Sequence, residues 1–239
     1  MKKKKIDFCH LCGQFKELTF EHIPPKSAFN DKPILIQNYE HLFDKKSYLY
    51  GKSFRSNNGS GSYCFCESCN NNTGTWYAND FSNFVKQAYV HFEKTSRVSK
   101  LNLVELNYKP LNVLKQILTM FLAIDHSGYL RDDKNLVEFI LEKENKSLPD
   151  KYQIYLYITI SKHKRLFGIQ WNNLNGTFNA HSEITFNPFG YFLAIDSPPP
   201  IETMTNITQF KDYSFNENAN FIIPLFYLKT DDKFLGQYN

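Results

Sequence analysis

Two Cys-x-x-Cys turns constrain the fold of this 239-residue chain more than any other feature. The first is Cys9-His10-Leu11-Cys12, and the second is Cys66-Glu67-Ser68-Cys69. This spacing lets two thiolates of one tight turn bind the same metal ion, and two such turns complete the tetrahedral ligand set of zinc. Four thiolates leave no open position for water or substrate. Cys9, Cys12, Cys66 and Cys69 therefore predict a structural zinc site, and any catalysis must use a different centre.

Two further residues compete for a place in this site. Cys64 lies two residues before Cys66, where it either substitutes for a ligand or is a buried thiol, and we favour the buried thiol. His10 lies inside the first turn, and with four thiolates available we expect it to be solvated or to support the ligands from outside. The chain has five cysteines, an odd number, and in a reducing compartment such a cluster is explained better by metal than by disulfides.

Composition places the chain among globular proteins that act inside the cell. Hydrophobic residues make up 42% of it, enough for a real core, and the formal net charge of +4 permits a polyanionic partner without requiring one. The lysines at positions 2–5 precede Ile6-Asp7-Phe8-Cys9, where a secretory signal needs an apolar stretch. Even Leu111–Ile124 is interrupted by polar residues, so no run is long enough to span a membrane. We expect a soluble, cytoplasmic protein.

The patterning predicts an α+β fold with two parts. Residues 1–95 hold the cysteines and little sustained periodicity, and residues 96–239 form an α+β accessory domain of unknown role. Helical spacing predicts helices over 76–95, from 110 or 111 to 125, and over 134–145. Runs rich in aromatic and β-branched residues predict a mainly antiparallel β body with strands over 152–161, 166–171, 182–186, 191–196 and 221–228, with a hairpin connection at 172–176.

A second motif lies between the two cysteine turns. The stretch Thr19-Phe20-Glu21-His22-Ile23-Pro24-Pro25 follows the first turn, and Asn70 directly follows the last cysteine of the second. Together they resemble the HNH endonuclease family. The resemblance implies a ββα-metal module around one catalytic divalent ion, with Glu21 as the acidic metal ligand, His22 as the general base and Asn70 as the second metal-side residue. Cys69–Tyr77 and the later Ser182-Glu183-Ile184 also resemble a group of uncharacterised bacterial HNH proteins.

The chemistry of phosphodiester hydrolysis explains these residue types. A base must take a proton from water, and the ordinary pKa of histidine, near 6.5, suits this task at neutral pH. Mg²⁺ or Mn²⁺ held by carboxylate and amide oxygens would neutralise charge that grows on the phosphate. His22 fits the first role, and Glu21 and Asn70 fit the second. The zinc site would bring Glu21 and Asn70 together across 48 intervening positions.

The sequence departs from the family pattern in three places. Glu21 stands where aspartate is commoner, and Asn70 replaces the final histidine. The stretch from His22 to Cys66 is longer than the usual hairpin, so the middle asparagine of the motif is unassigned. Asn57 and Asn58 are candidates for it, but in Ser56-Asn57-Asn58-Gly59 they serve equally well as turn residues, which is the interpretation we favour.

Three hypotheses for function follow. The first is a metal-dependent endonuclease acting on DNA rather than RNA, in a role such as defence against phage or mobile DNA, with a C-terminal body that supports dimerisation or a regulatory partner. The second is a non-catalytic zinc module that binds nucleic acid or protein. The third is a toxin nuclease whose body binds an inhibitor. Candidate contacts to the nucleic-acid backbone are Lys26, Lys45, Lys46, Lys52 and Arg55.

Overall fold

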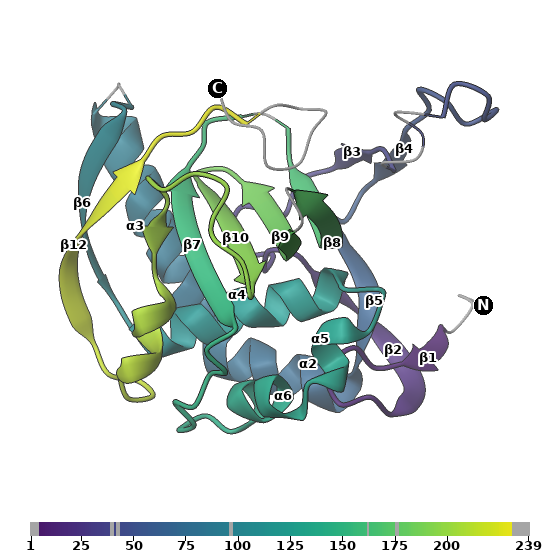
Figure 1. The fold of residues 1–239 in the computed structure, drawn as a ribbon, viewed down its shortest axis with the longest axis horizontal. Helices are drawn as coiled ribbons and strands as arrows, with labels where there is room; N and C mark the ends of the chain where they lie inside the picture. The colour runs from purple at the N-terminus through teal and green to yellow at the C-terminus, as the bar shows by residue number, and fades with distance from the viewer. Residues whose placement is uncertain are drawn as a thin grey trace.

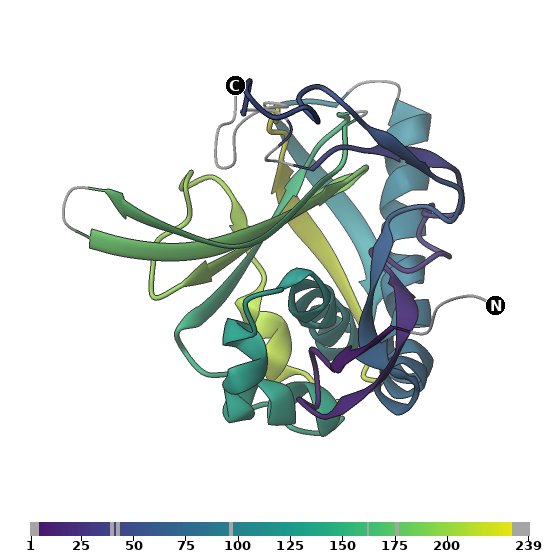
Figure 2. The same ribbon diagram turned by 90° about the vertical axis from the view of Figure 1, so that its right-hand side faces the viewer.

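The computed structural model describes residues 5–38, 41, 44–95, 98–161, 163–174 and 177–230. It confirms a mixed α+β architecture, with a four-cysteine cluster near the N-terminus, helices in the centre and antiparallel sheets in the C-terminal half. One large core cluster of buried apolar side chains includes residues of both halves, from Cys9 to Leu225. Figures 1 and 2 show the central helices between the N-terminal strands and the larger sheet.

The N-terminal strands form a small antiparallel sheet in the order β1-β2-β5. β1 (Ile6–Phe8) pairs with β2 (Phe15–His22), which pairs with β5 (Gly61–Cys66). One cysteine turn connects β1 to β2, and the other begins where β5 ends. A helical segment then runs without interruption through α2 (Glu67–Thr73), the π-helical η1 (Gly74–Ala78) and α3 (Asn79–Thr95).

A long insertion separates β2 from β5. Within it, β3 (Ile34–Ile36) and β4 (Phe54–Ser56) pair antiparallel as a sheet of their own. Figure 1 shows this pair and the following turns projecting from the body at the upper right. The insertion leaves the body just after the last residue of β2 and returns just before the first residue of β5, so both of its ends lie beside the pairing of His22 with Gly61.

Helix α4 (Pro110–Ile124) is the centre of the protein, and all its residues are buried. Pro110 stands in the first turn, where its missing N–H costs no hydrogen bond. Its neighbours include α3, β5, β8 and α6. Lys115 is fully buried yet satisfied, because its ammonium donates to the carbonyl groups of Glu142 and Lys143 at 2.7 and 2.9 Å. This contact caps the end of α6 (Lys134–Leu141), which follows the short α5 (Tyr129–Asp132).

The larger sheet is antiparallel, with the order β11-β7-β10-β9-β8. Its strands are β7 (Tyr152–Ile158), β8 (Arg165–Leu174), β9 (Thr177–Phe186), β10 (Phe189–Ile195) and β11 (Thr205–Asn206). Phe189 and Tyr191 are buried in the main core. Glu183 is buried as well, and it accepts a hydrogen bond from Arg165 at 3.0 Å.

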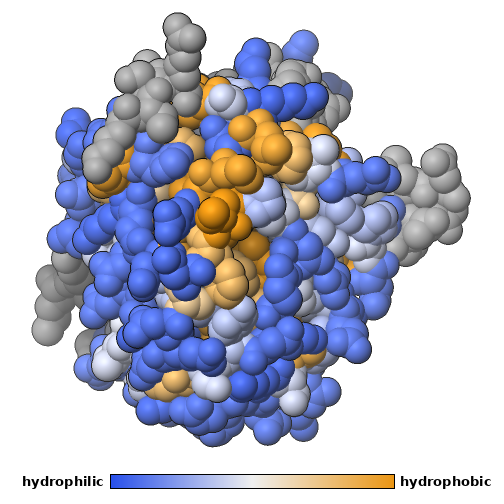
Figure 3. Space-filling view, turned by 90° about the vertical axis from the view of Figure 1, so that its left-hand side faces the viewer, coloured by the Kyte–Doolittle hydropathy of each residue, from blue (hydrophilic) through white to orange (hydrophobic). Residues whose placement is uncertain are grey.

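A separate two-stranded ribbon packs along α3. It consists of β6 (Leu101–Tyr108) and β12 (Ala219–Phe226), and the 3-10 helix η2 (Thr208–Asp212) precedes β12. Val104 and Leu106 face the core, whereas Leu101, Leu103 and Ile222 are exposed on the outer face. Figure 3 shows an apolar area on this side of the molecule.

The structure corrects several boundaries. The helix expected to begin at Trp76 begins at Glu67, so Thr73 lies inside it, where its hydroxyl donates to the Cys69 carbonyl. The third expected helix ends at Leu141 rather than Asn145. Strand β6 was not predicted. The connection expected at 172–176 joins paired strands, but residues 175 and 176 lie outside the described part of the chain.

Among the described residues, none of the helices combines the length and the apolar character that a membrane crossing requires.

Candidate functional site

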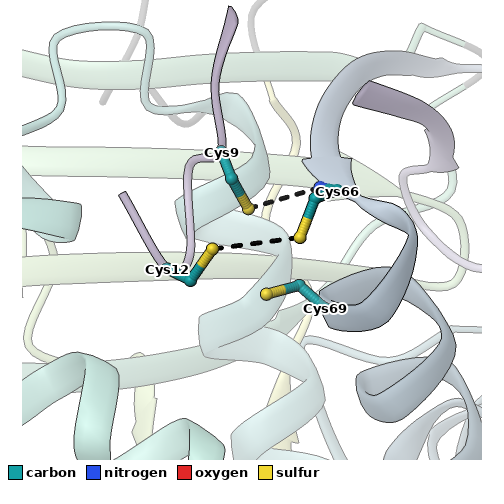
Figure 4. Close-up of side chains that lie close together, drawn as sticks. All are labelled: Cys9, Cys12, Cys66 and Cys69. Carbon is teal, nitrogen blue, oxygen red and sulfur yellow. Dashed lines mark hydrogen bonds between the residues drawn. The ribbon is translucent and has the colours of Figure 1, made fainter. Parts of the chain in front are cut away.

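The four predicted zinc ligands converge on one point. The sulfur atoms of Cys9, Cys12, Cys66 and Cys69 all lie within 4.8 Å of one another, and the sulfurs of Cys12 and Cys66 are 3.8 Å apart. Tetrahedral zinc with bonds of about 2.3 Å separates its sulfur ligands by roughly 3.8 Å. Figure 4 shows the four side chains pointing toward a common centre from the β1–β2 turn and the start of α2. The spacing of the thiols fits a zinc ion.

The surroundings of the cluster lower the pKa of the Cys9 and Cys66 thiols and raise that of Cys12 and Cys69. The pKa of Cys9 is lowered to about 4, because the Cys69 thiol donates a hydrogen bond to its sulfur and backbone groups add to this effect against the cost of burial. One of these donors is the backbone N–H of Cys66, at 3.3 Å. A thiolate that accepts hydrogen bonds from backbone N–H groups is ready to bind a metal ion.

Cys64 and His10, the two other residues considered as ligands, lie outside the four-cysteine cluster. Cys64 is fully buried and does not join the cluster, as expected, and burial raises the pKa of its thiol. His10 is half-buried, and its Nδ1 lies 3.2 Å from the carbonyl oxygens of Leu122 and Ala123 at the end of α4. Of the two expectations for His10, its position fits a residue that supports the ligands from outside rather than a solvated one. Its contacts attach the first cysteine turn to carbonyl groups at the end of the central helix.

The β2–β5 pair and the helix after it enclose the second candidate centre. The Asn70 side chain, on the first turns of α2, donates from Nδ2 to Thr19 Oγ1 at 2.9 Å and to the Phe20 carbonyl at 3.4 Å. Thr19 in turn donates to the Phe65 carbonyl on β5. Because the amide nitrogen of Asn70 is used in this way, its Oδ1 is the atom that remains available to a cation.

A cavity of about 520 Å³ opens beside the end of β2. Two small residues of η1, Gly74 and Ala78, line it, and a Cβ atom added to Gly74 would meet nothing within 4 Å. The helix thus leaves open space where a larger side chain would fill it. The lining residues are Glu21, His22, Pro25, Lys26, Ser27, Asp31, Gly74 and Ala78. Glu21 and His22 therefore share one cavity, whereas Asn70 lies one helical turn before it.

Glu21 is the most perturbed group in this cavity. Burial raises the pKa of its carboxyl group to about 7. Among the described residues, no ion pair or hydrogen bond involves its side chain. A carboxylate partly removed from water without a compensating cation carries a cost, and a divalent ion would reduce that cost. The carboxylate of Glu21 is the kind of oxygen donor that Mg²⁺ and Mn²⁺ accept.

Glu21→Gln is expected to stabilise the zinc-loaded protein against urea, and more at pH 8 than at pH 5. The folded-state pKa is raised from 4.5 to about 7, so the wild-type carboxyl favours folding while it is protonated. That contribution is complete below pH 4.5 and is lost as the pH rises through 7. The neutral amide of glutamine avoids this loss. At pH 8, the free energy of unfolding of Glu21→Gln should therefore exceed that of the wild type by up to about 3 kcal/mol.

Glu202→Gln provides the matched control, because Glu202 is exposed and lies outside the cavity. Its stability should change little at either pH. Adding Mg²⁺ should narrow the difference between wild type and Glu21→Gln at pH 8, because the ion binds the ionised carboxylate. Equal stability of wild type and Glu21→Gln at pH 8 would show that Glu21 bears no desolvation cost.

The imidazole of His22 is half-buried, and its pKa is lowered. Burial is the largest cause and the charge of Lys26 adds to it, while a hydrogen bond to the backbone of Asn58 acts in the opposite direction. A lowered pKa keeps the ring neutral at pH 7. When one ring nitrogen donates to a carbonyl, the other has a free lone pair and can accept a proton. Asn58 thus contacts His22 through its backbone and occupies a turn, which is the interpretation favoured from the sequence.

Two residues near the cavity were not predicted. Asn30 is fully buried, donates to the carbonyls of Pro24 and Ser60, and accepts from the Ser60 N–H, each at 2.7 Å. It thereby joins the end of β2 to the turn that carries Asn58. Asp31 follows directly and lines the cavity as a second carboxylate. Neither lies in a recognisable motif, since each reaches the site only through the path of the insertion.

Comparison with known proteins adds no assignment, because no family model, curated protein or solved structure matches this chain.

Proposed function

We propose that this protein is a metal-dependent endonuclease of the HNH type that hydrolyses phosphodiester bonds, with DNA as its substrate. The observation that carries the proposal is the pairing of a desolvated carboxylate, Glu21, with a neutral histidine, His22, in one open cavity. Groups with perturbed pKa values that share a cavity are the usual mark of a functional site. The order of strand, strand and helix around this cavity is also the order that the resemblance implies.

His22 is the general base in this proposal. Its ring is held by the backbone of Asn58 and remains neutral beside Lys26. A neutral imidazole accepts a proton from a water molecule as that water attacks the phosphorus, and Lys26 lies on the same cavity wall to attract the phosphate.

Glu21 and Asn70 are the proposed ligands of the divalent ion. When bound, Mg²⁺ or Mn²⁺ would neutralise charge on the phosphate and the leaving oxygen. Asn70 immediately follows Cys69, so the zinc cluster determines where its side chain lies. The zinc ion has no chemical role in the proposal, but it positions one ligand of the catalytic ion relative to the other.

Cleavage of supercoiled plasmid by the purified full-length protein tests the proposal. With Mg²⁺ or Mn²⁺, we expect nicked and then linear DNA, and a brief treatment with EDTA should abolish the reaction. Zinc content is measured before and after the treatment, and added Mg²⁺ should restore cleavage. This step separates loss of the catalytic ion from loss of structural zinc.

His22→Ala, purified in parallel with equal zinc content, excludes a contaminating nuclease. Cleavage that is equal in wild type and His22→Ala would contradict the proposal. An RNA substrate is assayed in the same way. If neither protein cleaves plasmid or RNA, a non-catalytic zinc module explains the chain better.

A further inference from the structure

The insertion between β2 and β5 forms an arm, which we define as residues 32–56. Of these, 32–38, 41 and 44–56 are described by the structure. Asp31 at one end of the arm lines the cavity, and Asn58 just beyond the other end contacts His22. Figure 1 shows β3, β4 and the turns beyond them projecting away from the body. The base of the arm therefore lies beside the cavity.

The arm is strongly cationic for its length. Its sequence contains five lysine or arginine residues and two acidic residues, a net charge of +3, while the whole chain has a formal net charge of +4. Every one of these five cations is exposed. They are Lys32, Lys45, Lys46, Lys52 and Arg55. None forms an ion pair within the described residues.

Local hydrogen bonds shape the far end of the arm. The Asp44 side chain accepts from the backbone N–H of Lys46 at 3.0 Å, and the Gly51 N–H donates to the carbonyl of His41 at 2.9 Å. These turns hold Lys45 and Lys46 on the outside. Among the described residues of the arm, none belongs to the buried apolar core, and its lysines and arginine are on the surface.

Aromatic side chains accompany the cations. The ring of Tyr48 is 81% exposed, and the ammonium of Lys52 lies 5.2 Å from its centroid. Tyr50 and Phe54 are exposed as well. Exposed rings interleaved with lysines are typical of surfaces that bind nucleic-acid strands, because phosphates pair with the cations and bases stack on the rings. Protein-binding surfaces, by contrast, are depleted in lysine.

We propose that the arm binds the phosphate backbone of a nucleic acid and that Tyr48 stacks on an unpaired base. The choice of ligand rests on the nuclease function proposed above, and the inference adds how the substrate is held beside the cavity. A strand held along the arm by Lys45, Lys46 and Lys52 would pass Asp31 and reach His22 and Lys26 in the cavity.

Binding is measured by the fluorescence anisotropy of a short labelled single strand and of the duplex with the same sequence, over a range of NaCl concentrations. Full-length protein with His22→Ala prevents cleavage during the titration. Replacing Lys45, Lys46 and Lys52 together by glutamine should weaken binding of both probes roughly 10- to 100-fold at low salt, and should reduce the slope of log K against log salt by about 2 to 3.

The control variant replaces Lys100, Lys134 and Lys229 by glutamine. These three lysines are exposed and lie outside the arm, so the variant loses the same net charge and should bind nearly as tightly as the parent protein. Tyr48→Ala should weaken binding of the single strand roughly 5- to 100-fold and leave binding of the duplex nearly unchanged. Zinc content and thermal melting are compared for all variants.

Equal affinities of the arm variant and the control variant would overturn the proposal, and would assign the cations to another ligand, such as a protein partner. Equal effects of Tyr48→Ala on both probes would overturn the stacking role. A protein that binds through the arm but cleaves nothing would disprove the nuclease function and leave this inference standing, so the two failures are distinguishable.

Discussion

Cys69→Ser is expected to lose bound zinc and the folded structure of the N-terminal module. Removing one thiolate leaves three ligands, and the apparent binding free energy of structural zinc at neutral pH is about 10–16 kcal/mol, much of which is folding free energy. The effect should be large because Cys69 lies at the start of the helix that continues into α3, and α3 packs on β6 and α4. Zinc content by atomic emission, with circular dichroism, measures both losses.

Cys64→Ser is the matched control. Cys64 is fully buried but does not belong to the cluster. The substitution should retain zinc, with a stability loss of about 1–3 kcal/mol for burying a hydroxyl in place of a thiol. If Cys64→Ser released zinc and Cys69→Ser retained it, the ligand set would be wrong.

His22→Ala is expected to reduce plasmid cleavage by about 10²- to 10⁴-fold, the usual contribution of a general base. The loss should fall on kcat, because the imidazole accepts its proton in the transition state and contributes little to substrate binding. His22 is the last residue of β2. The N–H of the next residue, Ile23, donates to the carbonyl of Ser60, and the Asn30 side chain donates to the same carbonyl, so the backbone here is held independently of the imidazole. The side chain can therefore be removed without disturbing the core. Single-turnover rates with equal zinc content measure the effect.

His91→Ala serves for comparison, since His91 lies on α3 outside the cavity and should retain full activity. If the two histidine variants cleaved equally well, His22 would not be the base. If His22→Ala changed KM alone, it would indicate a role in substrate binding instead.

The cysteine site was predictable from the sequence because its information is local. Each turn places two ligands within four residues of sequence. Only the approach of the two turns to one another depends on the tertiary structure. The strands of the C-terminal sheet were predictable for a similar reason, since their aromatic and β-branched residues form compact runs between turn residues. The helix at Pro110 followed from continuous apolar spacing after a proline.

The start of the helix at Glu67 could not be inferred from periodicity. Residues 67–75 are polar or small and show no apolar face, and they form a helix because Cys66 and Cys69 hold its first turn against β2. Strand β6 carries a strand signal that was overlooked, because its buried Val104, Leu106 and Tyr108 alternate with exposed Glu105 and Asn107. Its pairing with β12, more than a hundred positions away, was decided only by the tertiary structure.

The sequence by itself determined which groups can act: four thiols for zinc, and a carboxylate, an imidazole and an amide for a second centre. Only the tertiary structure decided how these groups behave. Burial raises the pKa of Glu21, the backbone of Asn58 orients His22, and Gly74 and Ala78 leave the cavity open above them. Desolvation and orientation depend on which chain segments surround a group, and here those segments are distant in sequence from the motif itself.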